Sequence, residues 1–106
     1  MAVVPSGYVN QTQLASDIER AKQRLGPEVV RVTHSVGADT SDEPSIFFRI
    51  VLTDSASNEE TLADVTGQIS GILFEELRPY ENWGLRPYFS FRSQSEQANR
   101  DDLAWA

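Results

Sequence analysis

Cysteine is absent from this sequence of 106 residues, and histidine occurs once. Without cysteine the chain has no disulfide, no thiolate zinc site and no cysteine nucleophile. No apolar run approaches the roughly 20 residues of a membrane-spanning helix, and residues 1–11 lack the basic and apolar regions of a secretory signal. We therefore expect a cytoplasmic protein that does not associate with a membrane.

Positive charge is also scarce. Nine Lys and Arg residues stand against 16 Asp and Glu residues, which gives a formal net charge of −7. Nonspecific nucleic-acid binding requires neutralisation of phosphates, so this acidity disfavours nucleic acid as a partner. The composition, 40% hydrophobic and 24% charged, is that of a globular protein. The length predicts one domain, residues 1–98, followed by a polar tail, residues 99–106.

Two segments have apolar residues at helical spacing. The first, about residues 11–25, ends at Gly26, a common helix stop. The second, about residues 58–77, follows a capping box in which Ser57 and Glu60 satisfy the first free backbone amides of the helix.

Three further segments, residues 28–36, 45–53 and 86–93, alternate between apolar and polar side chains, which is typical of strands. A polar turn at residues 37–44 indicates an antiparallel hairpin between the first two strands. We expect the inward-facing side chains to be Val30, Val32, His34, Val36, Ile46, Phe48, Ile50, Leu52, Phe89 and Phe91.

The element order α-β-β-α-β predicts an α+β fold of two layers, similar to ferredoxin-like domains. Two helices would cover one face of a three-stranded mixed sheet, because a helical crossover makes the second and third strands parallel within one sheet. Gly67 and Gly71 lie inside the second predicted helix, where each costs roughly 1 kcal/mol relative to alanine. Close packing against the sheet or the first helix would explain both glycines.

The face of the sheet that the helices leave uncovered is predicted to alternate arginine with aromatic residues. Such a surface is suited to a planar or anionic group. The same face could instead be a homodimer interface, or be covered by the N-terminal segment or the C-terminal tail. This candidate binding face consists of Arg31, Phe47, Arg49, Tyr88 and Arg92.

No catalytic or metal-binding pattern is recognisable. His34 falls on the inward face of the first predicted strand, which is typical of a core or edge residue. Asp39, Asp42 and Glu43 lack the spacing of a calcium-binding loop, and the sequence contains neither a Walker loop nor GxGxxG. We expect no enzymatic activity, no metal and no cofactor.

The tail carries two large apolar residues, Leu103 and Trp105. A tryptophan near a terminus can anchor a partner or fold back on its own domain. We favour folding back, because these two residues could cover an apolar edge left by the third predicted strand.

The segment ENWGLRPYFSFRSQSEQ (81–97), preceded by IFFRIVLTD (46–54) and LFEELRPY (73–80), resembles a group of small bacterial proteins of unassigned activity. The resemblance covers most of the chain from about Leu25 onward. It implies a bacterial, cytoplasmic protein and transfers no catalytic residue. The element order is also similar to that of KH-type domains, but their GxxG loop between two helices is missing, so RNA binding is not transferred.

Three functions follow from these patterns. The first is a non-enzymatic protein-interaction or regulatory module that binds another protein or a second copy of itself, for example one that neutralises a basic, nucleic-acid-directed partner. We favour it, because a net charge of −7 speeds and orients association with such a partner. The second is nucleic-acid or nucleotide binding through the candidate binding face, and the third is a small enzyme without a readable motif.

Overall fold

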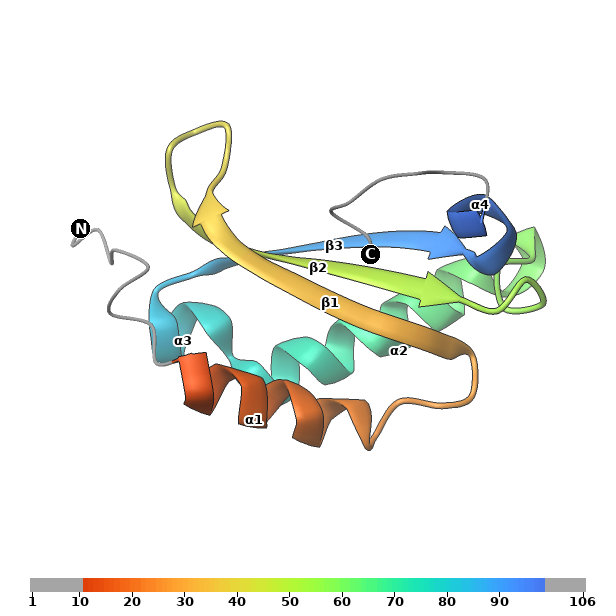
Figure 1. Cartoon of the computed structure of the whole chain (residues 1–106), viewed down its shortest axis with the longest axis horizontal. Helices are drawn as coiled ribbons and strands as arrows, with labels where there is room; N and C mark the ends of the chain where they lie inside the picture. Colours follow the sequence, from red (N-terminus) through yellow and green to blue (C-terminus); the bar gives the residue numbers. More distant parts are fainter. Residues whose placement is uncertain (1–10, 99–106) are drawn as a thin grey trace.

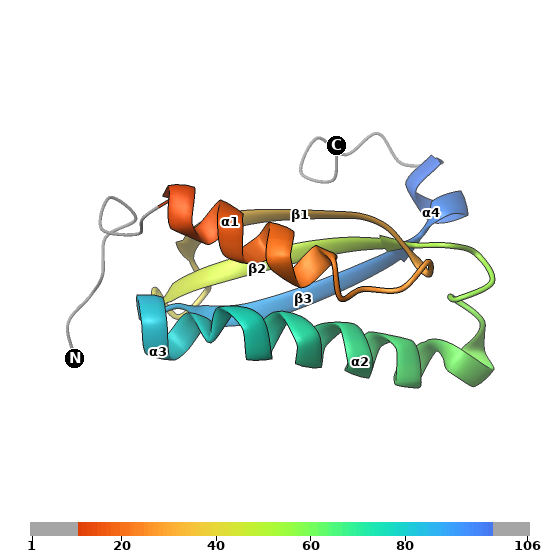
Figure 2. The same ribbon diagram turned by 90° about the horizontal axis from the view of Figure 1, so that it is seen from below.

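A computed structural model describes residues 11–98 of the chain. The central strand of its three-stranded sheet, β2 (Pro44–Leu52), pairs with β1 (Val29–Ala38) in antiparallel and with β3 (Arg86–Ser93) in parallel orientation. The helices α1 (Gln11–Lys22) and α2 (Glu59–Leu77) cover one face of this sheet, and the short helix α4 (Gln94–Ala98) lies on the opposite side (Figures 1 and 2). The predicted two-layer α+β fold is therefore confirmed. In chain order the elements are α1 (Gln11–Lys22), β1 (Val29–Ala38), β2 (Pro44–Leu52), α2 (Glu59–Leu77), α3 (Pro79–Trp83), β3 (Arg86–Ser93) and α4 (Gln94–Ala98).

The hydrophobic core fills the space between the two helices and the inner face of the sheet. Phe48 of β2 is 1% exposed and stacks on Phe89 of β3, with ring centroids 5.3 Å apart. Aromatic pairs of this geometry contribute beyond their buried area. The remaining core side chains are Leu14, Ile18 and Ala21 of α1, Val32 of β1, Ile46, Ile50 and Leu52 of β2, Ile69, Leu73 and Leu77 of α2, and the loop residues Ala56 and Leu85.

The expected inward position of Val30 is wrong. A register shift lies between Val29 and Arg31, where β1 has an extra residue relative to β2. Such a bulge changes which face the following side chains occupy. Val29 consequently packs against the core, whereas Val30 is 47% exposed.

The start of α2 also differs from the prediction. Asn58, rather than Ser57, is the N-cap residue, and its side chain accepts a hydrogen bond of 3.0 Å from the backbone amide of Glu60. The Ser57 hydroxyl donates instead to the carbonyl oxygen of Thr53. Asparagine and serine are about equally good N-caps, so the local sequence did not discriminate between neighbouring positions.

The expectation of close packing at Gly67 and Gly71 is wrong as well. A Cβ atom built on either glycine has no neighbouring atom within 4 Å. Both residues are exposed on α2. Nothing within the described part of the chain therefore requires glycine at these two positions.

Candidate functional site

The candidate binding face lies on the side of the sheet opposite α1 and α2. Successive residues of a strand point to alternate faces, and the pairing of the three strands sets the outward residues in rows across the sheet. All five predicted residues come together in three successive rows. These rows are Phe47–Tyr88, then Thr33–Arg49–Ser90, then Arg31–Val51–Arg92.

The first row is an aromatic pair whose position is fixed by a turn. Phe47 and Tyr88 stack with ring centroids 5.4 Å apart and an interplanar angle of 13°. The Tyr88 hydroxyl donates a hydrogen bond of 2.7 Å to a carboxylate oxygen of Asp39. The other carboxylate oxygen accepts from the backbone amides of Ser41 and Glu43. These bonds, that from Tyr88 first, lower the pKa of Asp39, so the carboxylate stays ionised and holds the tyrosine.

Two arginines of the face have no counter-charge among the residues that the structure describes. Arg31 and Arg49 form no ion pair with any residue in the described range 11–98, although the chain has 16 acidic residues. The Nε atom of Arg49 is buried and has no hydrogen-bond partner there, and neither has the hydroxyl of its neighbour Thr33. By contrast, ion pairs link Arg20 and Arg24 to Glu76, Arg78 to Glu81 and Arg86 to Asp39.

The fifth predicted residue, Arg92, is engaged by α4. One of its guanidinium nitrogens donates a hydrogen bond of 3.3 Å to the side-chain oxygen of Gln97. The helix itself is held in place from the loop after β2, because the backbone amide and the hydroxyl of Ser95 both donate to the carboxylate of Asp54. Both bonds from Ser95 lower the pKa of Asp54. Thus α4 borders one end of the candidate binding face.

A hollow of about 400 Å³ lies at this border. Arg31 and Val51 of the sheet face the residues of α4 across it, and the exposed Val30 forms part of its wall. Its lining residues are Val30, Arg31, Val51, Gln94, Gln97 and Ala98. The sequence did not predict α4, because this segment is short and polar and a distant contact, Asp54 with Ser95, holds it.

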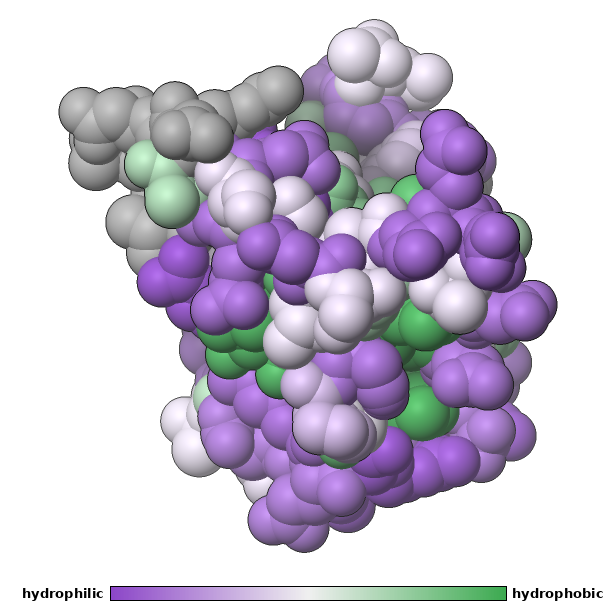
Figure 3. Space-filling view, turned by 90° about the vertical axis from the view of Figure 1, so that its right-hand side faces the viewer, coloured by the Kyte–Doolittle hydropathy of each residue, from purple (hydrophilic) through white to green (hydrophobic). Residues whose placement is uncertain are grey.

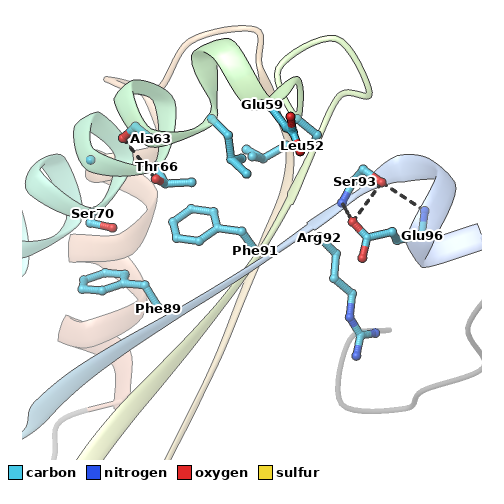
Figure 4. Close-up of a pocket in the computed structure, with 13 residues that line it drawn as sticks. Leu52, Glu59, Ala63, Thr66, Ser70, Phe89, Phe91, Arg92, Ser93 and Glu96 are labelled. Carbon is cyan, nitrogen blue, oxygen red and sulfur yellow. Dashed lines mark hydrogen bonds between the residues drawn. The ribbon is translucent and has the colours of Figure 1, made fainter.

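A second concave region, which the sequence did not indicate, separates α2 from β3. This groove of about 960 Å³ has Phe89 and Phe91 on one side and small residues of α2, among them Thr66 and Ser70, on the other (Figure 4). Arg92 points away from these rings (Figure 4), because successive side chains of a strand lie on opposite faces of the sheet. Seen from the end near α4, hydrophobic residues lie in small groups between hydrophilic ones (Figure 3).

The one histidine lies apart from the candidate binding face. His34 is paired with Phe48 across β1 and β2, on the inner side of the sheet, and is half-buried. Burial lowers its pKa, and the positive charges of Lys22 and Arg49 lower it further, so the ring stays neutral at pH 7. No group of three or more His, Asp or Glu side chains within residues 11–98 is placed to hold a metal ion.

The predicted tail anchor, Leu103 and Trp105, lies outside the described residues. Among the helices of residues 11–98, none combines the length and the apolar character needed to cross a membrane. Comparison of the chain with protein-family models, with curated proteins and with solved structures gives no match. The resemblance of residues 81–97 to a group of small bacterial proteins therefore stays a prediction.

Proposed function

We propose that this chain is a non-enzymatic protein-interaction module whose candidate binding face takes up an acidic segment of a partner protein. The supporting observation is a pair of arginines, Arg31 and Arg49, that have no counter-charge in the described part of the chain. A guanidinium donates paired hydrogen bonds to a carboxylate, and a buried donor without an acceptor costs about 1–3 kcal/mol. A partner carboxylate bound at Arg49 would remove this cost.

The net charge of −7 does not prevent such an association. At physiological ionic strength, charges more than about 8 Å apart at a protein surface are largely screened from each other. The charges nearest to a bound carboxylate therefore determine whether it is attracted. On the candidate binding face these nearest charges are the guanidinium groups of Arg31 and Arg49. The aromatic pair Phe47 and Tyr88, one row away, offers apolar contact to a neighbouring side chain of the same segment.

Nucleotide or nucleic-acid binding at the same face is the second candidate, since arginines beside aromatic rings also bind phosphates and bases. The geometry favours it less. Phe47 and Tyr88 each already give one ring face to the other, and the Tyr88 hydroxyl is bound to the anionic Asp39. Less ring surface is left for a base, and the Asp39 carboxylate beside Tyr88 would repel a phosphate held next to these rings.

A variant of the proposal is a regulator that neutralises a basic partner. Such a partner would bind on the helical side of the molecule rather than on the candidate binding face. There the first two turns of α2 carry Glu59, Glu60 and Asp64, none of which forms an ion pair within the described part of the chain. In either form we propose a protein of the bacterial cytoplasm that has no catalytic activity and no cofactor. The partner could also be a second copy of the chain.

The test is capture of partners by the tagged chain and by matched arginine variants, each with and without nuclease treatment. The double variant Arg31→Gln/Arg49→Gln removes the unpaired charges, and Arg78→Gln removes an exposed charge from the helical side as a control. We expect a stoichiometric protein that survives nuclease, binds the wild type and the control, and is lost from the double variant. Equal binding to the double variant would overturn the proposal, and nucleic acid recovered in an arginine-dependent way would replace it with the second candidate.

A further inference from the structure

The described part of the chain ends beside Arg31, which forms no ion pair within residues 11–98. Ala98, the last residue of α4, lines the same hollow as Arg31 and Val51. The sequence continues for eight residues, NRDDLAWA, with one basic residue, two adjacent aspartates and then four apolar residues, of which Leu103 and Trp105 are large. The last described residue therefore lies at one end of the candidate binding face.

We propose that the tail, residues 99–106, binds back onto the candidate binding face of its own chain. Asp101 and Asp102 supply the carboxylates that Arg31 and Arg49 do not find among residues 11–98. Leu103 and Trp105 then cover the aromatic pair. In this arrangement the tail occupies the surface that a partner segment uses.

The tail is long enough for these contacts. An extended chain spans at most about 3.3–3.6 Å per residue, so Asp102 lies within about 14 Å of Ala98. Adjacent rows on one face of a sheet are two residues, or about 7 Å, apart along each strand. Ala98 borders the row that contains Val51. The row of Arg49 is the next row along the strands, and the row of Phe47 is the one after it. Asp101 and Asp102 therefore reach the arginines before Trp105 reaches the aromatic pair.

The order of chemical groups along the tail matches the order of the rows. From α4 outward the face presents cationic side chains first and aromatic rings second. After Asn99 and Arg100, the tail presents the two carboxylates and then its large apolar side chains. Pairing in the opposite direction would set Trp105 against Arg31 and the aspartates against Asp39, which already accepts from Tyr88. The direction of the chain thus gives the complementary alignment.

This docking has a consequence for recognition. A partner segment has to displace the tail, so it must offer the same chemistry, a carboxylate followed by a large apolar side chain. The consequence rests on the proposed function, whereas the docking of the tail does not. Loss of docking with partner binding retained would refute the present inference alone.

The test uses the fluorescence of Trp105 in the full chain. Trp83 is the only other tryptophan, so Trp83→Phe leaves Trp105 as the reporter. In this background we expect blue-shifted emission and weak quenching by acrylamide. Both Asp101→Asn/Asp102→Asn and Arg31→Gln/Arg49→Gln should shift the emission to longer wavelength and increase quenching, whereas Arg78→Gln should change neither. Circular dichroism verifies that each variant is folded.

Three results would overturn the inference. The first is quenching of Trp105 as strong as that of free N-acetyltryptophanamide in the unsubstituted tail. The second is a shielded Trp105 that does not respond to the aspartate or the arginine substitutions, since its docking would then not depend on the proposed ion pairs. The third is an equal response to Arg78→Gln, which would show a general effect of charge.

Discussion

Alanine at Gly67 and Gly71 should stabilise the protein. Both glycines lie in the interior of α2, are exposed, and have no atom within 4 Å of a Cβ built on them. Glycine is about 0.8–1.0 kcal/mol less favourable than alanine inside a helix, because it loses more backbone entropy on folding. With no steric conflict, the double variant should gain roughly 2 kcal/mol in the free energy of unfolding.

This gain is large enough to measure. For a domain of about this size, 1 kcal/mol corresponds to roughly 4–8 °C in Tm, so the double variant should unfold about 8–16 °C higher in a thermal scan followed by far-UV circular dichroism. Urea unfolding should show a higher midpoint with an unchanged slope, because the surface exposed on unfolding is the same.

Gly84→Ala is the matched control, because the same substitution there should have the opposite effect. Gly84 has a φ of 66° in the left-handed region, where it caps α3. A side chain in this region costs roughly 1–2 kcal/mol. Suppose that Gly84→Ala destabilises the protein, as expected, but that Gly67→Ala/Gly71→Ala is neutral or destabilising. The two α2 glycines would then not be exposed, and another group would pack against them.

Three further predictions concern the core, a helix cap and pH. Phe48→Ala should lower the free energy of unfolding by about 3–5 kcal/mol, since it empties a fully buried site; a loss below 1 kcal/mol in urea unfolding would contradict the core packing. Asn58→Ala should cost about 1 kcal/mol through loss of the α2 cap, and an unchanged midpoint would show that the cap is unimportant. The pKa of His34 is lowered mainly by burial, so the unfolded chain takes up the proton first as pH falls. Stability should therefore decline from about pH 7 toward pH 5, and a decline of the same size in His34→Gln would assign it to other groups.

The strands and the long helix could be predicted from the sequence because their patterns are local. The third strand matches its expected bounds, Arg86–Ser93, and the second is displaced by one residue, to Pro44–Leu52. In both, large β-branched or aromatic side chains alternate with a period of two. The long helix α2, Glu59–Leu77, likewise has a continuous apolar stripe. The first helix ends at Lys22, earlier than predicted.

The features that the sequence missed depend on distant contacts. The bulge that turns Val30 outward arises from the pairing of β1 with β2, which period-two alternation within one strand does not reveal. The helix α4 has little apolar character, and a contact between Asp54 and Ser95, 41 positions apart, helps to hold it. The groove between α2 and Phe91 was missed because the glycines of α2 were expected to pack closely.

The membership of the candidate binding face was predictable, but its electrostatics were not. Alternation places Phe47, Arg49 and Tyr88 on one side of the sheet whichever strands are neighbours. Whether an arginine forms an ion pair depends on which acidic residues the fold places next to its guanidinium group. Only the structure shows that Arg49 has no counter-charge within residues 11–98 and that Tyr88 is bound to Asp39.

The most direct test of the central claim is the affinity of the captured partner for Arg49→Gln compared with Arg78→Gln. Loss of a hydrogen-bonded partner to a charged group costs about 1.5–3 kcal/mol, which corresponds to roughly a 10- to 150-fold higher Kd. We predict a weakening of this size for Arg49→Gln, reduced at high salt, and a Kd near the wild-type value for Arg78→Gln. Equal Kd values for wild type and Arg49→Gln would contradict the account, because the unpaired arginine would then contribute nothing to recognition.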